Sequence, residues 1–233
     1  MHHIYCISGL GADKRIFQKL RIENAQLHFI EWELPELHDT MHSYALRLAR
    51  QIVHDNIILM GVSFGGMLAT EINRHYINSR NGIKPINEEA LNESLVVKKT
   101  ILISSCKTNA EFPSLMQLAG KIRLHRAMPY NLVLRNSVLN RFVFDLRSQD
   151  EELYLKRLML QENNVALIKR SIHIILSWKA APPEQLVHIH GSADRLLTPG
   201  KIKADYWIKD GGHFMVWNKA EEISAILNNL LKE

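Results

Sequence analysis

The hydrophobic positions of this chain fall into short β-rich runs that alternate with longer amphipathic stretches. Such alternation is typical of βα units that build a parallel sheet, so the pattern predicts the α/β class. Most runs are nearly continuous in apolar residues, which indicates strands covered by helices on both faces. The predicted strands are His2–Ser8, Leu27–Glu31, Ile57–Val62, Lys99–Ser104, Leu186–His190 and Asp205–Lys209.

Between these strands, apolar residues recur at helical spacing. The spacing predicts helices over Met41–His54, Gly65–Ser79 and Ala220–Lys232, the last with its apolar residues on one stripe. Arg80–Ser94 contains an Asn-Gly pair, a Lys-Pro pair and scattered acids. Turn residues of this kind predict a surface loop or a short helix there.

The alternation breaks over residues 107–179. About 73 residues pass with helical patterns, such as Ser114–His125 and Glu151–Leu160, and without a convincing central strand. A single crossover between two strands does not need so much chain. The pattern predicts an inserted helical cap (lid) at 107–179 on a core formed by 1–106 and 180–233, with Pro182-Pro183 at the return to the sheet.

Composition and charge narrow the classes of protein that remain. The chain has 233 residues, 46% hydrophobic and 23% charged, which is close to an ordinary globular domain. The net charge of +5 is concentrated in the predicted cap, where 12 Lys and Arg face 6 Asp and Glu. These cations are spread through amphipathic sequence without a zinc-finger or RNP-like motif, so we expect solvated helix faces rather than a nucleic-acid partner.

Further absences shape the expectations about location and cofactors. No apolar run approaches the roughly 18–20 residues of a membrane span, and no secretory signal pattern opens the chain. The two cysteines, Cys6 and Cys106, lie in apolar segments, where reduced core thiols are favoured over a disulfide, as in cytoplasmic proteins. No cluster of histidine, cysteine or acidic residues shows metal-ligand spacing, so no metal and no cofactor is expected.

The strongest local motif is Gly61-Val62-Ser63-Phe64-Gly65, directly after an apolar run and before a predicted helix. Gly-x-Ser-x-Gly in this setting is the signature of a nucleophile elbow, a strained turn that exposes a serine hydroxyl at the start of a helix. A Gly-rich turn with an incidental serine is the structural alternative. The setting favours Ser63 as a nucleophile.

A serine hydroxyl needs a base, and the base needs a group that orients it. Asp194 follows one predicted strand and His213 follows the next, on a glycine loop. Both loops open at the sheet edge that carries the serine, because all the strands are parallel. His190, at the end of its own strand, is the rival base. The rival acids, all less favoured than Asp194, are Asp145, Asp205 and Asp210.

An oxyanion hole requires two converging hydrogen-bond donors. One is expected from the amide of Phe64, the residue after the nucleophile. The other is expected from the loop after the first strand, where Gly9 and Gly11 let the backbone turn and Leu10 is the favoured donor. A dinucleotide-binding interpretation of this loop fails because Lys14 stands where the third glycine would be.

These motifs together resemble the α/β-hydrolase family over nearly the whole chain. The resemblance implies a Ser63–His213–Asp194 triad, a helical cap at 107–179, and a mostly parallel six-stranded sheet flanked by helices that lacks the family's first two strands. Two local features depart from the family pattern: Ser8-Gly9 stands where His-Gly is frequent, and the crossover 191–204 has only 14 residues. The short crossover predicts a turn or a single helical turn.

The resemblance further implies a hydrolase of carboxylic esters or thioesters that acts on a small-molecule substrate through an acyl-enzyme. A C–C bond hydrolase, a lyase or synthase using the same triad, and a weakly active binding protein stay open as alternatives. Serine at position 63 argues against epoxide hydrolase chemistry, which uses an aspartate there. The residues expected to line an apolar acyl pocket, although such side chains are also typical of a core, are Met67, Met116, Met128, Phe142 and Met215.

Overall fold

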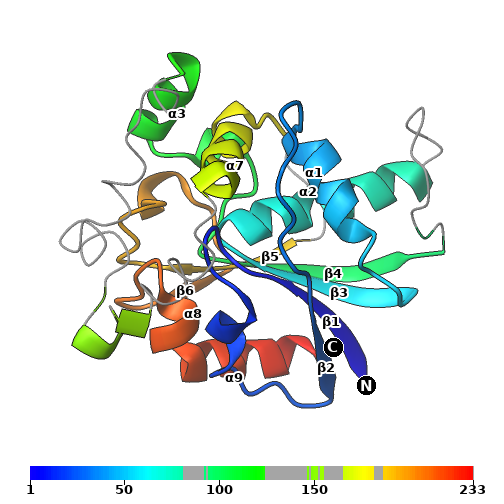
Figure 1. The fold of residues 1–233 in the computed structure, drawn as a ribbon. Helices are drawn as coiled ribbons and strands as arrows, with labels where there is room; N and C mark the ends of the chain where they lie inside the picture. Colours follow the sequence, from blue (N-terminus) through cyan, green and yellow to red (C-terminus); the bar gives the residue numbers. More distant parts are fainter. Residues whose placement is uncertain are drawn as a thin grey trace.

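A computed structural model describes residues 1–80, 92, 94–123, 146, 148–151, 153–154, 165–180 and 186–232. Its centre is a six-stranded sheet in the order β2-β1-β3-β4-β5-β6, with every neighbouring pair parallel (Figure 1). The strands are β1 His2–Ile7, β2 Ala25–Phe29, β3 Asn56–Val62, β4 Val96–Ile103, β5 Leu186–Gly191 and β6 Tyr206–Ile208. All six predicted strands are therefore present, in the predicted parallel arrangement.

Helices cover both faces of the sheet (Figure 1). On one face lie α1 (Met41–Ala49) and α2 (Phe64–Arg80), and on the other lie α8 (Met215–Asn218) and α9 (Ala220–Leu230). Side chains alternate between the two faces, so Tyr5 and Ile7 join the core beneath α1 and α2, whereas Ile4 and Cys6 join the core beneath α9. This two-sided burial accounts for the continuous apolar runs of the strands.

Several element bounds differ from the expectation. The first helix ends at Ala49 rather than at position 54, because Arg50 and Gln51 donate their amides three residues back and tighten the last turn before β3. Strand β4 begins at Val96, three residues early, since it pairs with β3 from Asn56 onward. The four-residue helix α8 was not anticipated.

The segment predicted as a cap contains helices in its described part. It contains the short 3-10 turn η2 (Asn109–Glu111), α3 (Ser114–Lys121) and α7 (Val165–Ser177). Helix α7 packs against α3 and against α1 (Figure 1). Most of the predicted helix Glu151–Leu160 and the loop predicted at 80–94 lie outside the described residues.

Two further expectations are met in the fold. The short crossover after β5 contains only the 3-10 turn η4 (Pro199–Lys201) before β6. Cys6 and Cys106 are both buried and unbridged, and burial raises the pKa of each thiol. None of the helices in the described ranges combines the length and the apolar character that a membrane crossing requires.

Candidate active site

The turn between β3 and α2 holds Ser63 in the left-handed region of backbone space, with φ of 53°. Glycine is required on both sides of it, because a Cβ at Gly61 would lie 2.3 Å from the Gly65 carbonyl oxygen and one at Gly65 would lie 2.2 Å from the Ile7 carbonyl oxygen. The Ser63 carbonyl accepts a hydrogen bond of 2.6 Å from the hydroxyl of Ser105, just after β4. The strained turn is thus fixed by its neighbours, as predicted for an elbow.

Three side chains predicted to act together meet at the carboxyl edge of the sheet. His213 Nε2 lies 2.9 Å from Ser63 Oγ, and His213 Nδ1 lies 2.8 Å from Asp194 Oδ2. His213 is only 5% exposed and Asp194 only 2%. The structure therefore connects hydroxyl, imidazole and carboxylate in one line of hydrogen bonds, from residues 150 and 19 positions apart in sequence.

The loops after β5 and β6 position the acid and the base because they lock onto each other. The amide of Ala193 donates to the Gly211 carbonyl at 2.9 Å, and that of Asp210 donates to the Ser192 hydroxyl at 2.9 Å. A Cβ at Gly191 would come within 2.1 Å of the Gly211 oxygen, so only glycine allows this approach. These contacts position Asp194 and His213 relative to each other.

Asp194 is held as a carboxylate. Its Oδ1 accepts hydrogen bonds from the amides of Leu196 and Leu197 at 2.9 and 2.8 Å. Burial by itself raises the pKa of Asp194. The charge and hydrogen bond of His213, with the help of the Leu197 amide, lower it by more, so the pKa of Asp194 lies below its ordinary value. A charged Asp194 favours the His213 tautomer with a proton on Nδ1, which leaves Nε2 free to accept from Ser63.

The rival base His190 occupies a different position. Its ring is completely buried, and its Nε2 lies 2.8 Å from the Leu197 carbonyl, to which it donates, and 3.6 Å from Asp194 Oδ2. Burial lowers the pKa of His190, so this ring is neutral and packs beneath the acid. The geometry places His213, not His190, against the serine.

The two amides predicted for an oxyanion hole belong to segments that flank Ser63. Gly9 lies against Ser63, since a Cβ built on it would be 3.4 Å from the Ser63 Cβ. Within the described part of the chain, neither the Leu10 amide nor the Phe64 amide donates to an acceptor. Phe64 is the first residue of α2, where the helix dipole adds positive potential. Two amides without an acceptor beside Ser63 are what the predicted oxyanion hole requires, and their role stays a prediction.

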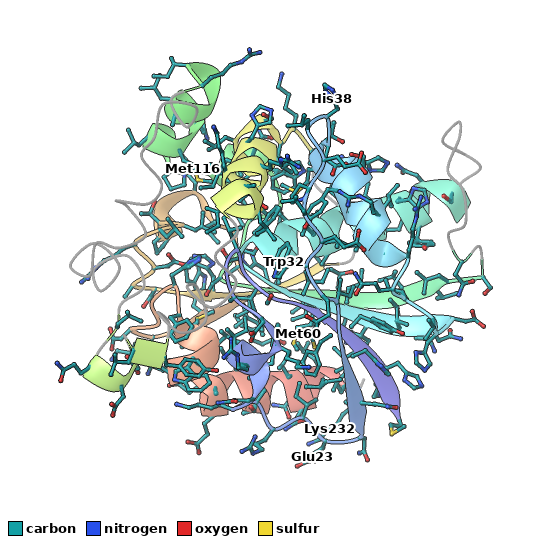
Figure 2. All side chains as sticks on the ribbon, viewed as in Figure 1. Glu23, Trp32, His38, Met60, Met116 and Lys232 are labelled. Carbon is teal, nitrogen blue, oxygen red and sulfur yellow. The ribbon has the colours of Figure 1, made fainter. Side chains whose placement is uncertain are left out.

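A residue that supports this loop, Trp32, was missed by sequence reasoning. Trp32 is labelled in Figure 2. Its indole N–H lies within hydrogen-bond distance of Ser8 Oγ at 2.8 Å and of the Ala12 carbonyl at 2.9 Å, and Ser8 Oγ donates to that carbonyl at 2.8 Å, which ties the two ends of the loop around Leu10 together. The Trp32 ring also stacks on Phe64, with centroids 5.4 Å apart. Ser8 at the family's His-Gly position is the sequence signal that could have drawn attention to this contact.

The residues predicted to line a substrate pocket have mixed positions. Met67 and Met215 are 2% and 0% exposed and belong to the two core clusters. Met116 on α3 is partly buried against the core near α7 (Figure 2). Met128 and Phe142 lie outside the described residues. Contact of any of these side chains with substrate stays a prediction.

Buried polar contacts join the end of the cap segment to the core. The Trp178 indole donates to Glu71 Oε1 on α2 at 2.6 Å, and Glu71 is completely buried. The opposite oxygen of Glu71 pairs with Arg74 and lies 3.3 Å from His42 Nδ1. These contacts tie the end of the segment predicted as a cap to helix α2.

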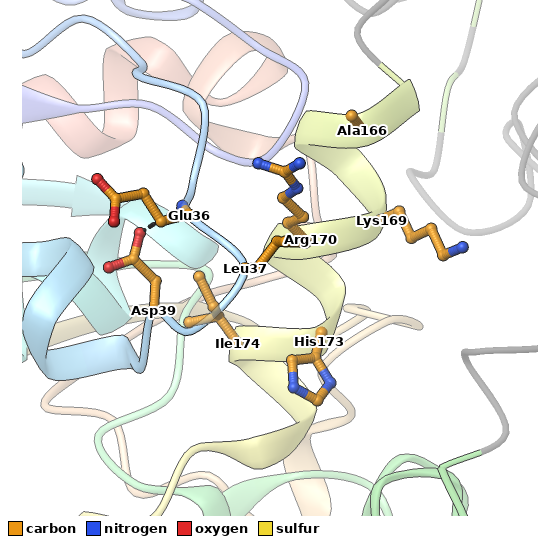
Figure 3. A pocket seen from close by; sticks show the side chains of 8 residues that line it. All are labelled: Glu36, Leu37, Asp39, Ala166, Lys169, Arg170, His173 and Ile174. Atoms are coloured by element: carbon orange, nitrogen blue, oxygen red, sulfur yellow. Dashed lines mark hydrogen bonds between the residues drawn. The ribbon is translucent and has the colours of Figure 1, made fainter.

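A pocket of about 380 Å³ lies between α7 and the loop before α1 (Figure 3). Lys169 and Arg170 line it from the predicted cap, opposite Glu36 and Asp39 (Figure 3). Arg170 also donates to the Pro35 carbonyl at 2.7 Å. Of the two cations, Arg170 thus contacts a carbonyl of the loop before α1, and both share a pocket with the two acids.

Comparison with solved structures places the fold among the α/β hydrolases. A thioesterase from the prodiginine biosynthetic pathway of Streptomyces coelicolor matches 97% of this chain and 84% of its own, with a TM-score of 0.61 and 14% identity. A thermophilic esterase from Thermogutta terrifontis matches 100% and 90%, with a TM-score of 0.62 and 14% identity. An epoxide hydrolase from Bacillus megaterium matches 100% and 94%, with a TM-score of 0.62 and 13% identity.

The chain therefore has the α/β-hydrolase fold, as its motifs predict, with the six-stranded sheet described above. No protein-family model matches the sequence, and no curated protein matches it.

Proposed function

We propose that this protein is a serine hydrolase that cleaves carboxylic esters or thioesters of small-molecule substrates through an acyl-enzyme. The observation that carries the proposal is the unbroken contact from Ser63 Oγ to His213 Nε2 at 2.9 Å and from His213 Nδ1 to Asp194 Oδ2 at 2.8 Å. This arrangement of nucleophile, base and orienting acid is the one that acyl transfer requires.

The acylation step follows from these positions. His213 Nε2 takes the proton of Ser63 as the serine oxygen bonds to the acyl carbon. The tetrahedral intermediate then collapses, the bond from carbon to the alkoxy or thiolate group breaks, and the leaving group takes the proton from His213. Asp194 stabilises the imidazolium that exists between the two transfers, without taking a proton itself.

Deacylation uses the same residues with water as the nucleophile. His213 removes a proton from water, the hydroxide attacks the acyl carbon, and the Ser63 oxygen leaves with that proton. The amides of Phe64 and Leu10 are the proposed oxyanion donors in both steps. Loss of one such donor typically raises the barrier by about 2.7–4 kcal/mol.

Support for this bond type comes from the nucleophile and from the neighbours. A serine nucleophile forms an acyl ester, and thioesterases and esterases are among the proteins that share the fold. We extend the proposal to the cap: residues 107–179 form a lid over the substrate site. Helix α7, which packs on α1, and the contact between Trp178 and Glu71 are consistent with this placement.

A fluorophosphonate probe tests the proposal directly, because it phosphonylates an activated serine. The wild type should be labelled, and Ser63→Ala should not. Ser79→Ala is the matched control, since Ser79 lies near the far end of the same helix and donates to the His75 carbonyl. The control should label as the wild type does. An unlabelled wild type, or equal labelling of wild type and Ser63→Ala, overturns the proposal in favour of a binding protein.

Substrate assays then separate the remaining chemistries. Short p-nitrophenyl esters and acyl-CoA thioesters should be turned over, and activated esters, which acylate the serine faster than water releases it, should give a burst of the first product. A lyase or synthase that uses the triad as a base alone would show no burst and no trapped acyl-enzyme on Ser63.

A further inference from the structure

Three histidines that are far apart in the sequence converge at the edge of the sheet opposite to the proposed active site. His3 lies on β1, His28 on β2, and His54 in the loop between α1 and β3. One ligating atom from each of the three side chains lies within 4.8 Å of the others, and all three residues are half-buried. His3 Nδ1 and His28 Nε2 are 2.9 Å apart, and the rings of His3 and His54 stack with centroids 3.7 Å apart.

The strand register brings these rings together. Tyr5 on β1 pairs with His28 on β2, and the alternation of side chains puts His3 on the same face of the sheet as Tyr5. His3 pairs with Ile57 on β3, so the loop that carries His54 arrives beside it. The cluster is therefore a product of the parallel sheet and not of a local motif.

At least one ring nitrogen of the cluster carries no proton, as a metal ligand must. In the contact between His3 and His28, one nitrogen must accept, so that nitrogen carries no proton. Three imidazolium ions at this spacing would also repel one another strongly. A divalent cation between the three lone pairs would replace that repulsion with attraction.

Tyr5 provides an outer contact that orients one ring. Its hydroxyl lies 2.7 Å from His54 Nδ1 and accepts from the Val53 amide at 3.0 Å. The Tyr5 ring also stacks on His28, with centroids 4.8 Å apart. Hydrogen bonds of this kind set the tautomer and direction of metal-binding histidines.

We propose that His3, His28 and His54 form a binding site for one divalent transition-metal ion of the zinc type, with the fourth coordination position open. Zinc takes imidazole nitrogens at about 2.0–2.1 Å in tetrahedral geometry, so its ligand atoms stand roughly 3.3 Å apart. The nitrogens of His3 and His28 are 2.9 Å apart, close to this value, and all three ligand atoms lie within 4.8 Å of one another. Because the rings of His3 and His54 stack nearly parallel, one of them must turn for its lone pair to point at the shared ion. Among the described residues no carboxylate joins the three histidines, and an all-imidazole ligand set favours zinc, nickel or copper over calcium or magnesium.

The metal would join β1, β2 and the loop before β3, a structural role separate from ester hydrolysis. His3 lies near the amino end of β1 and His54 just before β3, whereas Ser63 follows the carboxyl end of β3, roughly 20 Å away along seven residues of strand. His28 lies farther along, beside Tyr5, but on the strand β2 at the edge of the sheet. Binding of metal should therefore raise the unfolding temperature without being needed for labelling of Ser63.

Zinc titration of chelator-treated protein against a chromophoric competitor tests the site. We expect one Zn²⁺ per chain in the wild type and at least about 100-fold weaker binding in His28→Gln and in His54→Gln. Loss of a residue that only hydrogen-bonds a metal ligand already weakens binding by about 10- to 100-fold, and loss of a ligand itself should weaken it at least as much. The matched control is His38→Gln, an exposed histidine in the loop before α1 (Figure 2). It should bind as the wild type does, and Tyr5→Phe should bind about 10- to 100-fold more weakly.

Spectra and stability complete the test. Co²⁺ should produce the intense visible bands of a tetrahedral site in the wild type and in His38→Gln, and Zn²⁺ should raise the unfolding temperature of these two proteins alone. Circular dichroism of the metal-free variants shows whether each is folded. If His28→Gln does not fold, His54→Gln, which changes a loop residue, still tests the site. The proposal is overturned if the wild type and the two ligand variants bind zinc equally, which is the result expected if His2 and His3 bind the metal without the other histidines. It is also overturned if His38→Gln loses binding.

Discussion

The elbow glycine Gly65 offers a quantitative test of how tightly the active-site turn is packed. A methyl group added there would lie 2.2 Å from the Ile7 oxygen and 2.4 Å from the Ser8 oxygen, where ordinary contact begins at 3.4 Å. Both obstacles are backbone atoms of β1 and the loop after it, so neither can rotate away. The first strand or the start of α2 must move by about 1 Å to admit the Cβ.

The size of the effect follows from this displacement. Overpacking of a rigid site costs about 1–3 kcal/mol, and a backbone clash on two atoms belongs at the upper end, about 3 kcal/mol. For a chain of this length, each kcal/mol lowers the unfolding temperature by about 2–4 °C, so Gly65→Ala should unfold about 6–12 °C below the wild type. Ile7 and Ser8 lead directly into the loop of Leu10, so kcat/KM for a p-nitrophenyl ester should fall about 100- to 1,000-fold as one oxyanion donor is displaced.

Gly200→Ala is the matched control for this prediction. Gly200 lies in η4, its φ is not left-handed, and a Cβ there meets nothing within 4 Å. Its unfolding temperature should equal that of the wild type or exceed it by the equivalent of at most about 1 kcal/mol. The two proteins are compared by thermal unfolding and by steady-state kinetics. If Gly65→Ala matches Gly200→Ala in stability and activity, the reasoning from close backbone approach is refuted.

Three further predictions concern the acid, a buried histidine and the oxyanion loop. Asp194→Asn should keep KM within a few-fold and lower kcat about 10⁴-fold, because the His213 tautomer is lost; an unchanged kcat on the same ester would remove Asp194 from the triad. Burial, with the charges of His190 and Lys107, lowers the pKa of His188 to about 3, so the unfolded chain takes up a proton below pH 6.5 that the folded chain refuses. The free energy of unfolding should therefore fall by about 2 kcal/mol as the pH drops from 6.5 to 5 because of His188. Urea unfolding should show a smaller fall in His188→Leu, and an equal fall in the two proteins would mean that the ring is not buried. Trp32→Phe removes the indole bond to Ser8 and should lower kcat/KM with little change in unfolding temperature; equal kcat/KM would show that Leu10 is held without it.

Local patterns in the sequence were sufficient to predict the sheet. Each strand is recognisable from a run of apolar residues, and the two-sided cover explains why those runs do not alternate. The elbow is equally local, because its glycines are needed within two residues of Ser63. The bounds of α1 and β4 were less predictable, since they depend on where the chain turns to meet a neighbouring strand.

The three members of the candidate triad could also be named from sequence, because parallel strands bring the loops after β3, β5 and β6 to one edge. The same argument does not decide between His190 and His213, since His190 lies at the end of β5 and His213 follows β6, at the same edge of the sheet. The choice depends on two loops that lock at Gly191 and Gly211 and turn His213 toward Ser63.

The chain alone thus determined the α/β fold and the residues of the candidate triad, because strand periodicity and turn residues act over a few neighbouring positions. Only the tertiary structure revealed the Trp32 brace, the link from Trp178 to Glu71, and the cluster of His3, His28 and His54. These contacts join residues more than twenty positions apart with no motif between them. Their existence is decided by register and by the packing of distant segments, which no local pattern encodes.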